Sequence, residues 1–270
     1  MKSIIRNISC TLCFGVSLAS TVIASDGQST WTVDDVLSAE WASDYKISPG
    51  CEWVAWVKST PDKDKGESVG NLFLSSMTKN QEIQLTRGSD GCSSPKWSPD
   101  GRWIAFLSSR PNLKAKADDK EKTQIWLINP FGGEPWALTS GDRAVYMFDW
   151  ASSNDIIYSA QEEPSAYEQT LKDRKDFTQV VEDEAHEPPV RLFKVEATSG
   201  KVTRLTDNED RISEFAVSPD ATQLVTIHNG SLKYSYDRAA VPITFLTDLK
   251  TGKRKQIFAE TKFGAWCPRW

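Results

Sequence analysis

The residues with the clearest chemical potential in this sequence are the carboxylates of one acidic stretch, residues 161–190. Its net charge is −6, whereas the whole chain of 270 residues has a net charge of −5, so the acidity of the chain is concentrated there. A carboxylate-lined entry of this kind would attract a cationic group such as the amino terminus of a peptide. The alternative is a solvated insertion that binds no ligand. The acidic residues of the stretch are Glu162, Glu163, Glu168, Asp173, Asp176, Glu182, Asp183, Glu184 and Glu187.

The sequence lacks the residue pattern that nucleophilic catalysis usually requires. The chain has two histidines, His186 and His228, and its one near match to G-x-S-x-G is GVSLA at residues 15–19, inside an apolar N-terminal segment. A Ser-His-Asp arrangement needs a serine held at a strand-to-helix elbow beside a base. No Cys/His cluster has the spacing of zinc ligands, and no glycine-rich loop follows a strand. We therefore expect no catalytic residue, no cofactor and no metal site in this chain.

Charge and cysteine content exclude further classes of protein. A net charge of −5 gives no basic footprint for nucleic acid. Beyond the N-terminal segment the chain keeps Cys51, Cys92 and Cys267, whose spacing is typical neither of a disulfide framework nor of a metal site. The sequence leaves open whether any two of them form a disulfide.

The N-terminus has the layout of a secretory signal peptide. Lys2 and Arg6 precede a mostly apolar run, and the small residues before Ser25 suit a cleavage site after Ala24. The run is shorter than the ~20 apolar residues that span a bilayer, which disfavours a membrane anchor. We expect export to the periplasm or the medium, with no membrane span after residues 1–24 are removed.

One short motif recurs at near-regular spacing along the rest of the chain. SPGCEWVAW at residues 48–56 matches SPDGRWIAF at residues 98–106. Weaker copies occur at residues 150–158 and 217–227, and residues 266–270 resemble the beginning of a fifth copy. Self-similarity of this period indicates a repeat architecture.

The residue pattern within each repeat predicts four short strands. The SPDG tetrapeptide at 98–101 fits a type I turn, with proline second and glycine fourth. Residues 103–107 are apolar on both alternating faces, which predicts a strand buried on both sides. Four-stranded units of this length with a recurring tryptophan are typical of an all-β β-propeller. A β-sandwich is the alternative, but it requires no fixed period.

The repeats define the expected organisation of the chain. A signal peptide (residues 1–24) and a lead-in with a short helix (25–46) precede a partial β-propeller (47–270). That propeller is incomplete, with about four blades plus the start of a fifth. Its blades lie near residues 47–86, 97–139, 149–206 and 215–258, and the next begins at 266. Because the recurring tryptophans occupy equivalent positions, we interpret Trp97 and its counterparts as packing residues between blades.

The loops of such a blade divide between its two ends. Tight turns such as SPDG share one end, and the longer connections open at the other. The longest connection is the acidic stretch 161–190, within which residues 166–181 have helical character. Long, irregular loops on one face favour that face for interactions.

The WSPDG repeat at residues 97–101 resembles the repeat of two propeller groups, the TolB-like periplasmic propellers and the N-terminal propeller of prolyl oligopeptidase-family (S9) serine peptidases. Residues 31–37 (WTVDDVL) are similar to the Thr-x-x-Asp-Leu lead-in of many family propellers, with Thr32 and Asp35 forming a helix-capping pair. The third-blade insert resembles the charged insert of bacterial members in the dipeptidyl-peptidase and acylaminoacyl-peptidase branches.

The resemblance to these peptidases implies a role in hydrolysis of peptides. Such enzymes carry the Ser, Asp and His of their triad on an α/β-hydrolase domain after the propeller, and the propeller restricts which substrates enter. Nothing in residues 31–270 matches that domain, so we expect the N-terminal part of such an enzyme, inactive alone. Some members hold the amino terminus of the substrate with paired glutamates, which makes Glu162 and Glu163 the candidate contacts. The alternative is a non-enzymatic TolB-like module that binds protein partners.

Overall fold

A computed structural model describes residues 31–62, 66–111, 122–162, 165–176, 187–229, 241–260 and 268–270. The expected signal peptide, Glu163, His186, Trp266 and Cys267 lie outside these residues. The chain divides into two compact units, Met1–Leu37 and Ser38–Trp270. Neither of the two helices in the described ranges is long and apolar enough to cross a membrane.

The first unit contains the short helix α1 (Val33–Leu37). The backbone N–H of Thr32 donates to a carboxylate oxygen of Asp35 at 2.8 Å, and the N–H of Asp35 donates to the Thr32 hydroxyl at 3.2 Å. These reciprocal bonds satisfy donors that a helix N-terminus otherwise leaves free. The predicted capping pair is therefore confirmed.

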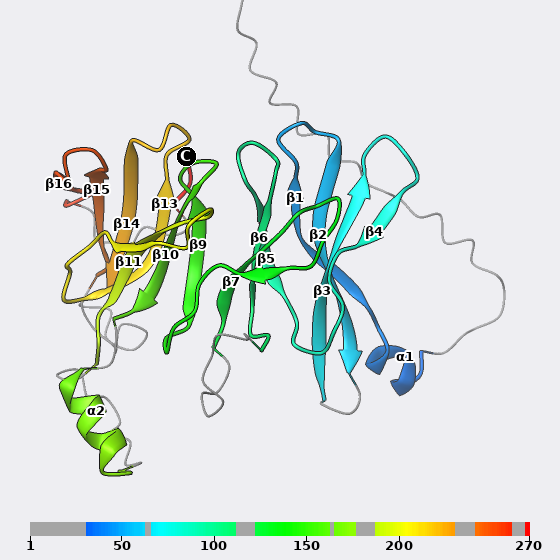
Figure 1. Cartoon of the computed structure of the whole chain (residues 1–270), viewed down its shortest axis with the longest axis horizontal. Coiled ribbons are helices and arrows are strands. Elements are labelled where there is room, and N and C mark those ends of the chain that lie inside the picture. Colours follow the sequence, from blue (N-terminus) through cyan, green and yellow to red (C-terminus); the bar gives the residue numbers. More distant parts are fainter. Residues whose placement is uncertain are drawn as a thin grey trace, which may run out of the picture. The chain divides into compact units, whose positions relative to one another are not determined.

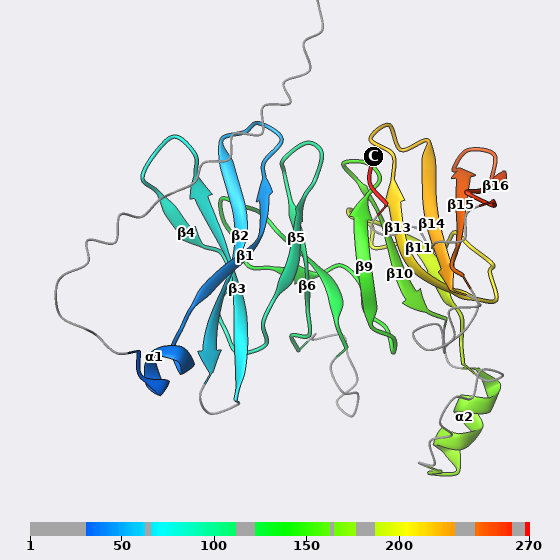
Figure 2. The same cartoon turned by 180° about the vertical axis from the view of Figure 1, so that it is seen from behind.

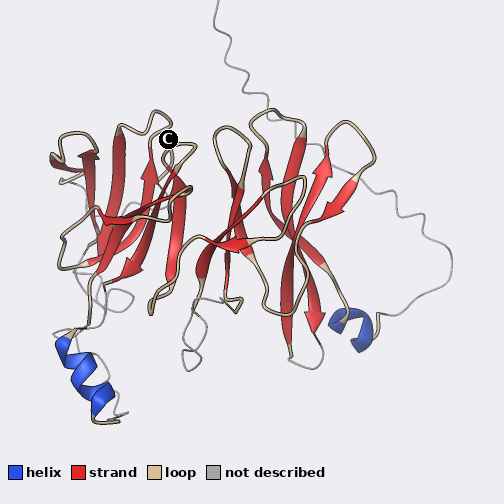
Figure 3. Ribbon diagram, in the orientation of Figure 1, coloured by secondary structure: helices blue, strands red, loops and turns tan. Residues whose placement is uncertain are grey.

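The second unit consists of four-stranded antiparallel sheets in chain order (Figures 1 and 3). Blade 1 contains β1 (Trp41–Ile47), β2 (Trp53–Asp62), β3 (Glu67–Ser76) and β4 (Glu82–Gln84). Blade 2 contains β5 (Ser93–Trp97), β6 (Ile104–Ser108), β7 (Gln124–Ile128) and β8 (Trp136–Ala137). Blade 3 contains β9 (Val145–Trp150), β10 (Asp155–Gln161), β11 (Val190–Glu196) and β12 (Val202–Arg204). Blade 4 contains β13 (Arg211–Val217), β14 (Gln223–Asn229), β15 (Ile243–Asp248) and β16 (Arg254–Ile257).

This arrangement confirms the predicted all-β propeller of four-stranded blades. Blades 3 and 4 are linked into one eight-stranded sheet by a single parallel pair, Val190 with Arg211. The same order of strands can be followed from behind in Figure 2. One boundary differs from the expected one, because β1 begins at Trp41, inside the stretch 25–46 that we assigned to the lead-in. Trp41, Tyr45 and Ile47 alternate along β1, but their side chains are exposed, and the repeat motif begins only after the strand, at residue 48.

The serine of each SPDG-like turn joins the first two strands of its blade. The N–H of Gly101 donates to the carbonyl of Ser98 at 2.9 Å, which confirms the predicted turn. The Ser98 hydroxyl donates to Asp100 at 2.6 Å and accepts from the N–H of Trp103 at 3.0 Å. Ser218 repeats both bonds in blade 4, with Asp220 at 2.6 Å and Gln223 at 2.9 Å. The motif is therefore a structural turn.

The fourth turn position requires a left-handed backbone in three blades. Gly101 adopts φ 72°, and its counterparts Cys51 and Ala221 adopt 56° and 54°. A side chain in this region costs about 1 kcal/mol or more. We expect Ala221→Gly to raise the free energy of unfolding by about 1 kcal/mol, measured by urea denaturation. The reciprocal Gly101→Ala should lower it by a similar amount. A stabilising effect of both substitutions would contradict this account.

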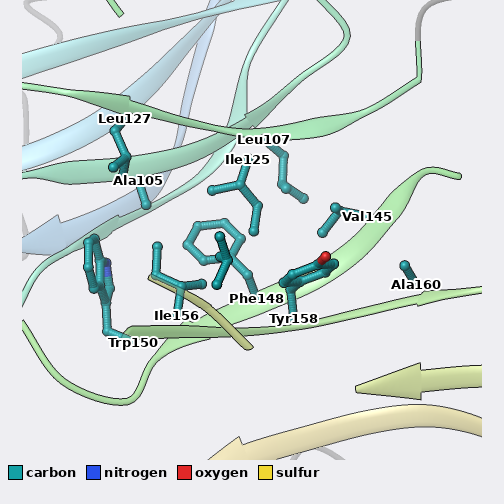
Figure 4. Close-up of a cluster of buried hydrophobic side chains, with 11 residues drawn as sticks. Ala105, Leu107, Ile125, Leu127, Val145, Phe148, Trp150, Ile156, Tyr158 and Ala160 are labelled. Carbon is teal, nitrogen blue, oxygen red and sulfur yellow. The ribbon is translucent and has the colours of Figure 1, made fainter. Parts of the chain in front are cut away.

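The two faces of each blade pack against different neighbours. Strand β6 is buried along its whole length, as predicted. Its Ala105 and Leu107 join the cluster with blade 3 shown in Figure 4, and its Ile104 and Phe106 join the cluster with blade 1. Alternate side chains of one strand thus enter two cores, which is why the sequence of β6 is apolar throughout.

Tryptophans at the ends of first strands also link successive blades by hydrogen bonds. The Trp97 indole donates to the carbonyl of Lys46 in blade 1 at 2.9 Å, and the Trp150 indole donates to the carbonyl of Lys96 in blade 2 at 3.1 Å. The Trp270 indole donates to the carbonyl of Ala216 in blade 4 at 3.3 Å. Our interpretation of Trp97 as an inter-blade residue is confirmed. Trp270 thus occupies the position of Trp97 and Trp150 beside blade 4.

Candidate functional site

The acidic stretch 161–190 connects β10 to β11 at the end of blade 3 opposite the SPDG-like turns. Its described part contains the helix α2 (Ala166–Asp173), which projects beyond the strands in Figure 1. The helix is shorter than the expected 166–181 because Arg174 caps it and Lys175 has a left-handed φ of 54°. Residues 177–186 lie outside the described part.

The start of α2 is fixed by an ionic contact from the preceding blade linker. Ser165 and Glu168 form a capping box, with the Ser165 N–H donating to a Glu168 carboxylate oxygen at 2.8 Å. Nη2 of Arg143 contacts both oxygens of that carboxylate, at 2.7 and 2.8 Å, and its Nε donates to the carbonyl of Glu162 at 3.0 Å. Burial acts to raise the pKa of Glu168, but the bonds from Arg143 and Ser165 outweigh it and hold this pKa below its usual value. Arg143 therefore anchors both Glu162 and the helix of the insert.

Glu162, one of the two predicted contacts for a substrate amino terminus, is engaged by arginines. One carboxylate oxygen accepts hydrogen bonds from Arg191 and, at 3.3 Å, from Arg204. Its side chain is 26% exposed. Two guanidinium groups balance the Glu162 charge, which leaves it less able to attract a free ammonium group. Glu163 lies outside the described residues, so the assignment of the pair stays a prediction.

Arg191 replaces an amide that the first two blades carry at the same place. Gln124 of blade 2 donates from its side chain to the carbonyl of Gly141 at 3.3 Å, and Arg191 donates from Nε to the corresponding carbonyl of Asn208 at 2.9 Å. Both residues directly precede a strand amide that donates to a threonine hydroxyl, on Thr139 and Thr206. Arg191 was not predicted as a site residue. Its repeat-equivalent position is occupied by an arginine only in blade 3, and this difference between the blades could have indicated it.

A second polar group in blade 4 has the order acid, imidazole, hydroxyl. Nδ1 of His228 lies 2.8 Å from an oxygen of Asp210, and its Nε2 lies 2.9 Å from the hydroxyl of Thr226. Nδ1 is the donor, because an ionised carboxylate only accepts. His228 and Thr226 are each only 2% exposed, so a substrate does not reach this hydroxyl and the group is structural. Burial acts to raise the pKa of Asp210, but the hydrogen bond from His228 outweighs it and the pKa lies below its usual value.

The site as described has charges and hydrogen-bond donors but no accessible nucleophile beside a base. Within the described ranges no cluster of His, Cys, Asp and Glu could hold a metal ion. Cys51 is exposed and Cys92 is buried, both as free thiols. Burial raises the pKa of the Cys92 thiol, which disfavours a reactive thiolate there. The arrangement can orient a helix and recognise charged groups.

Comparisons with known proteins connect this fold to two groups. The chain is 24% identical over 207 residues to the uncharacterized peptidase YuxL of Bacillus subtilis, covering 72% of this chain and 30% of that protein. A putative TolB of Agrobacterium tumefaciens superposes with a TM-score of 0.52 at 16% identity, covering 84% of this chain and 65% of that one. The acylaminoacyl peptidase of Pyrococcus horikoshii gives 0.54 at 12% identity, covering 82% of this chain and 33% of that one.

No family model matches the chain. The solved structures establish the β-propeller fold, and they include both groups that the WSPDG repeat resembles. The chain spans about a third of the length of the two peptidases. The sequence similarity to the Bacillus peptidase supports a propeller associated with peptidases.

Proposed function

We propose that the chain is the propeller portion of an exported serine peptidase acting on peptides, in which the propeller docks to a hydrolase domain and gates substrate entry. The observation that carries the proposal is the similarity to a peptidase along 72% of the chain. The insert supports a role in gating substrate entry, because Arg143 fixes the position of a helix that projects from one end of blade 3. The triad would belong to a hydrolase domain that residues 31–270 do not contain.

The coding DNA downstream of codon 270 provides the first test. We expect the reading frame to continue into a segment with G-x-S-x-G, and the protein translated from the whole frame to hydrolyse dipeptidyl or acyl-aminoacyl substrates. The purified chain 25–270 should be inactive on the same substrates. Hydrolysis by chain 25–270 purified from a host that lacks such peptidases would refute the proposal that the activity belongs to a separate hydrolase domain.

A non-enzymatic TolB-like module is the second candidate. It is favoured by the Agrobacterium structure, of which this chain covers 65%. A reading frame that stops after a few more blades, without G-x-S-x-G, would support this candidate. In either case the expected export is checked by N-terminal sequencing of the protein in the periplasmic or culture fraction, which should begin at Ser25.

The proposed contacts for a peptide amino terminus are Glu162 and Glu163, and the arginines on Glu162 shift this role toward Glu163. We expect Glu163→Gln in the full-length enzyme to raise KM about tenfold for peptides with a free amino terminus, because an ion pair is lost. KM for amino-blocked peptides should stay unchanged. Equal effects on both substrates would exclude recognition of the amino terminus by Glu163.

A further inference from the structure

The packed interface between blades 3 and 4, here called the 3–4 seam, lacks a bond that its counterparts have. Trp97 and Trp150 pair with Ile104 and Ile156 of the next strand, and in blade 4 Val217 pairs in the same way with Leu224. Val217 therefore stands where blades 2 and 3 have the indole donor. A valine side chain has no hydrogen-bond donor. The turn end of the 3–4 seam thus has no indole bond at this position.

The 3–4 seam also has one aromatic ring fewer in its cross-strand pair. In blades 2 and 3, the face toward the preceding blade carries a cross-strand aromatic pair, Phe106 with Trp126 and Tyr158 with Phe193. In blade 4 the corresponding pair is Thr226 with Phe245. Loss of an aromatic ring removes apolar area that would otherwise be buried between blades.

The polar group of His228 occupies the same face. Its ring stands edge-on to Phe245 with a centroid distance of 4.9 Å, two residues after Thr226 on β14. The corresponding position is Ser108 in blade 2 and Ala160 in blade 3. Blade 4 therefore presents a buried imidazole and a hydroxyl toward blade 3, where the other seams bury mainly apolar side chains.

The opposite end of the 3–4 seam is firmly tied, and it is the end from which the insert emerges. Val190 of blade 3 pairs with Arg211 of blade 4. The Asn208 side chain donates to the carbonyl of Val190 at 3.0 Å and to Asp210 at 2.9 Å. Arg191 in turn donates to the carbonyl of Asn208 at 2.9 Å. These bonds tie blade 3 to the linker that leads into blade 4, beside the Glu162–Arg191 contact.

We infer that the 3–4 seam is a hinge: blade 4 separates from blade 3 at the turn end and pivots on the bonded insert end. Blades 1 to 3 move as one body, because both seams among them have the indole bond and the aromatic pair. Opening exposes the faces of Leu224 and Ile157, which are buried in the closed form. This motion is independent of the proposed peptidase role, since it follows from the packing of the blades alone.

Thiol labelling at three equivalent buried positions tests the hinge. Leu224, Ile104 and Ile156 each lie on the face toward the preceding blade and are at most 1% exposed. Each is replaced by cysteine in the chain 25–270 with Cys51, Cys92 and Cys267 changed to serine or alanine. The rate of labelling by a small thiol reagent is measured in native buffer. After the labelling rate due to global unfolding is subtracted, the remainder reports how often each seam opens.

We expect Leu224→Cys to label about tenfold faster than Ile104→Cys and Ile156→Cys, with a shallower dependence on urea, because local opening exposes little surface. Adding Val217→Trp to Leu224→Cys should slow the labelling about threefold or more by supplying an indole donor. Equal rates for the three cysteines, or a steep urea dependence for Leu224→Cys that matches global unfolding, would overturn the hinge. The labelling comparison decides the question even if the added tryptophan prevents folding.

Discussion

Replacing Trp150 by alanine is expected to lower the free energy of unfolding by about 4 kcal/mol, the cost of a large cavity in a packed core. Trp150 is 8% exposed and lies in the cluster between blades 2 and 3 (Figure 4). Its indole also donates to the carbonyl of Lys96. Since a typical domain is stable by only about 5–15 kcal/mol, this loss would remove roughly a quarter to four-fifths of the stability of the domain.

Trp150→Phe separates the two contributions. The phenyl ring keeps most of the packing but cannot donate to Lys96, so we expect a loss of about 1–2 kcal/mol. Trp31→Phe is the control, because Trp31 is 81% exposed and should change stability by less than about 0.5 kcal/mol. Urea denaturation followed by circular dichroism measures all three. If Trp150→Phe unfolds at the wild-type urea concentration, the indole bond contributes nothing to stability.

Asp210→Ala is expected to destabilise the protein by about 2 kcal/mol near neutral pH. The substitution leaves Nδ1 of His228 without its acceptor in a buried position and also removes one of the acceptors of the Asn208 side chain. Asp207→Ala is the matched control, since Asp207 is an exposed carboxylate three residues earlier. Its effect should be within about 0.5 kcal/mol of zero.

The effect of Asp210 should depend on pH. Its pKa in the folded protein lies below the usual value, so its contribution is present above about pH 4 and is lost as the pH falls through the lower folded pKa. The difference in unfolding free energy between wild type and Asp210→Ala should therefore shrink between pH 5 and pH 2. A difference that grows over this range would contradict the proposed stabilisation of the ionised carboxylate.

The sequence predicted features that recur in more than one blade. The SPDG turns, the doubly buried strand β6 and the inter-blade role of Trp97 each depend on local residues whose pattern repeats about every 50 positions. Strand β1 falls in the expected lead-in because the recurring motif, which defines the predicted blades, begins only at residue 48. Its place in blade 1 follows from its antiparallel backbone pairing with β2, which the motif does not indicate.

The candidate site was predicted only in location. The acidic stretch indicated the correct end of blade 3, but the bonding of Glu162 depends on Arg191 and Arg204, which lie 29 and 42 residues further along the chain. Arg143, the anchor of α2, comes from the linker before blade 3. Such contacts arise from where loops meet in space, and a local pattern of residue types does not encode them.

The indole bonds between blades form in a fixed order during translation. Trp97 bonds to a carbonyl 51 residues before it, so blade 1 receives this bond only after the first strand of blade 2 has left the ribosome. At about 5–20 residues per second, that interval lasts roughly 3–10 seconds. The apolar face of blade 1 that packs on blade 2 stays uncovered during this time. A chaperone that binds nascent chains would find its target in these intervals, once for each blade.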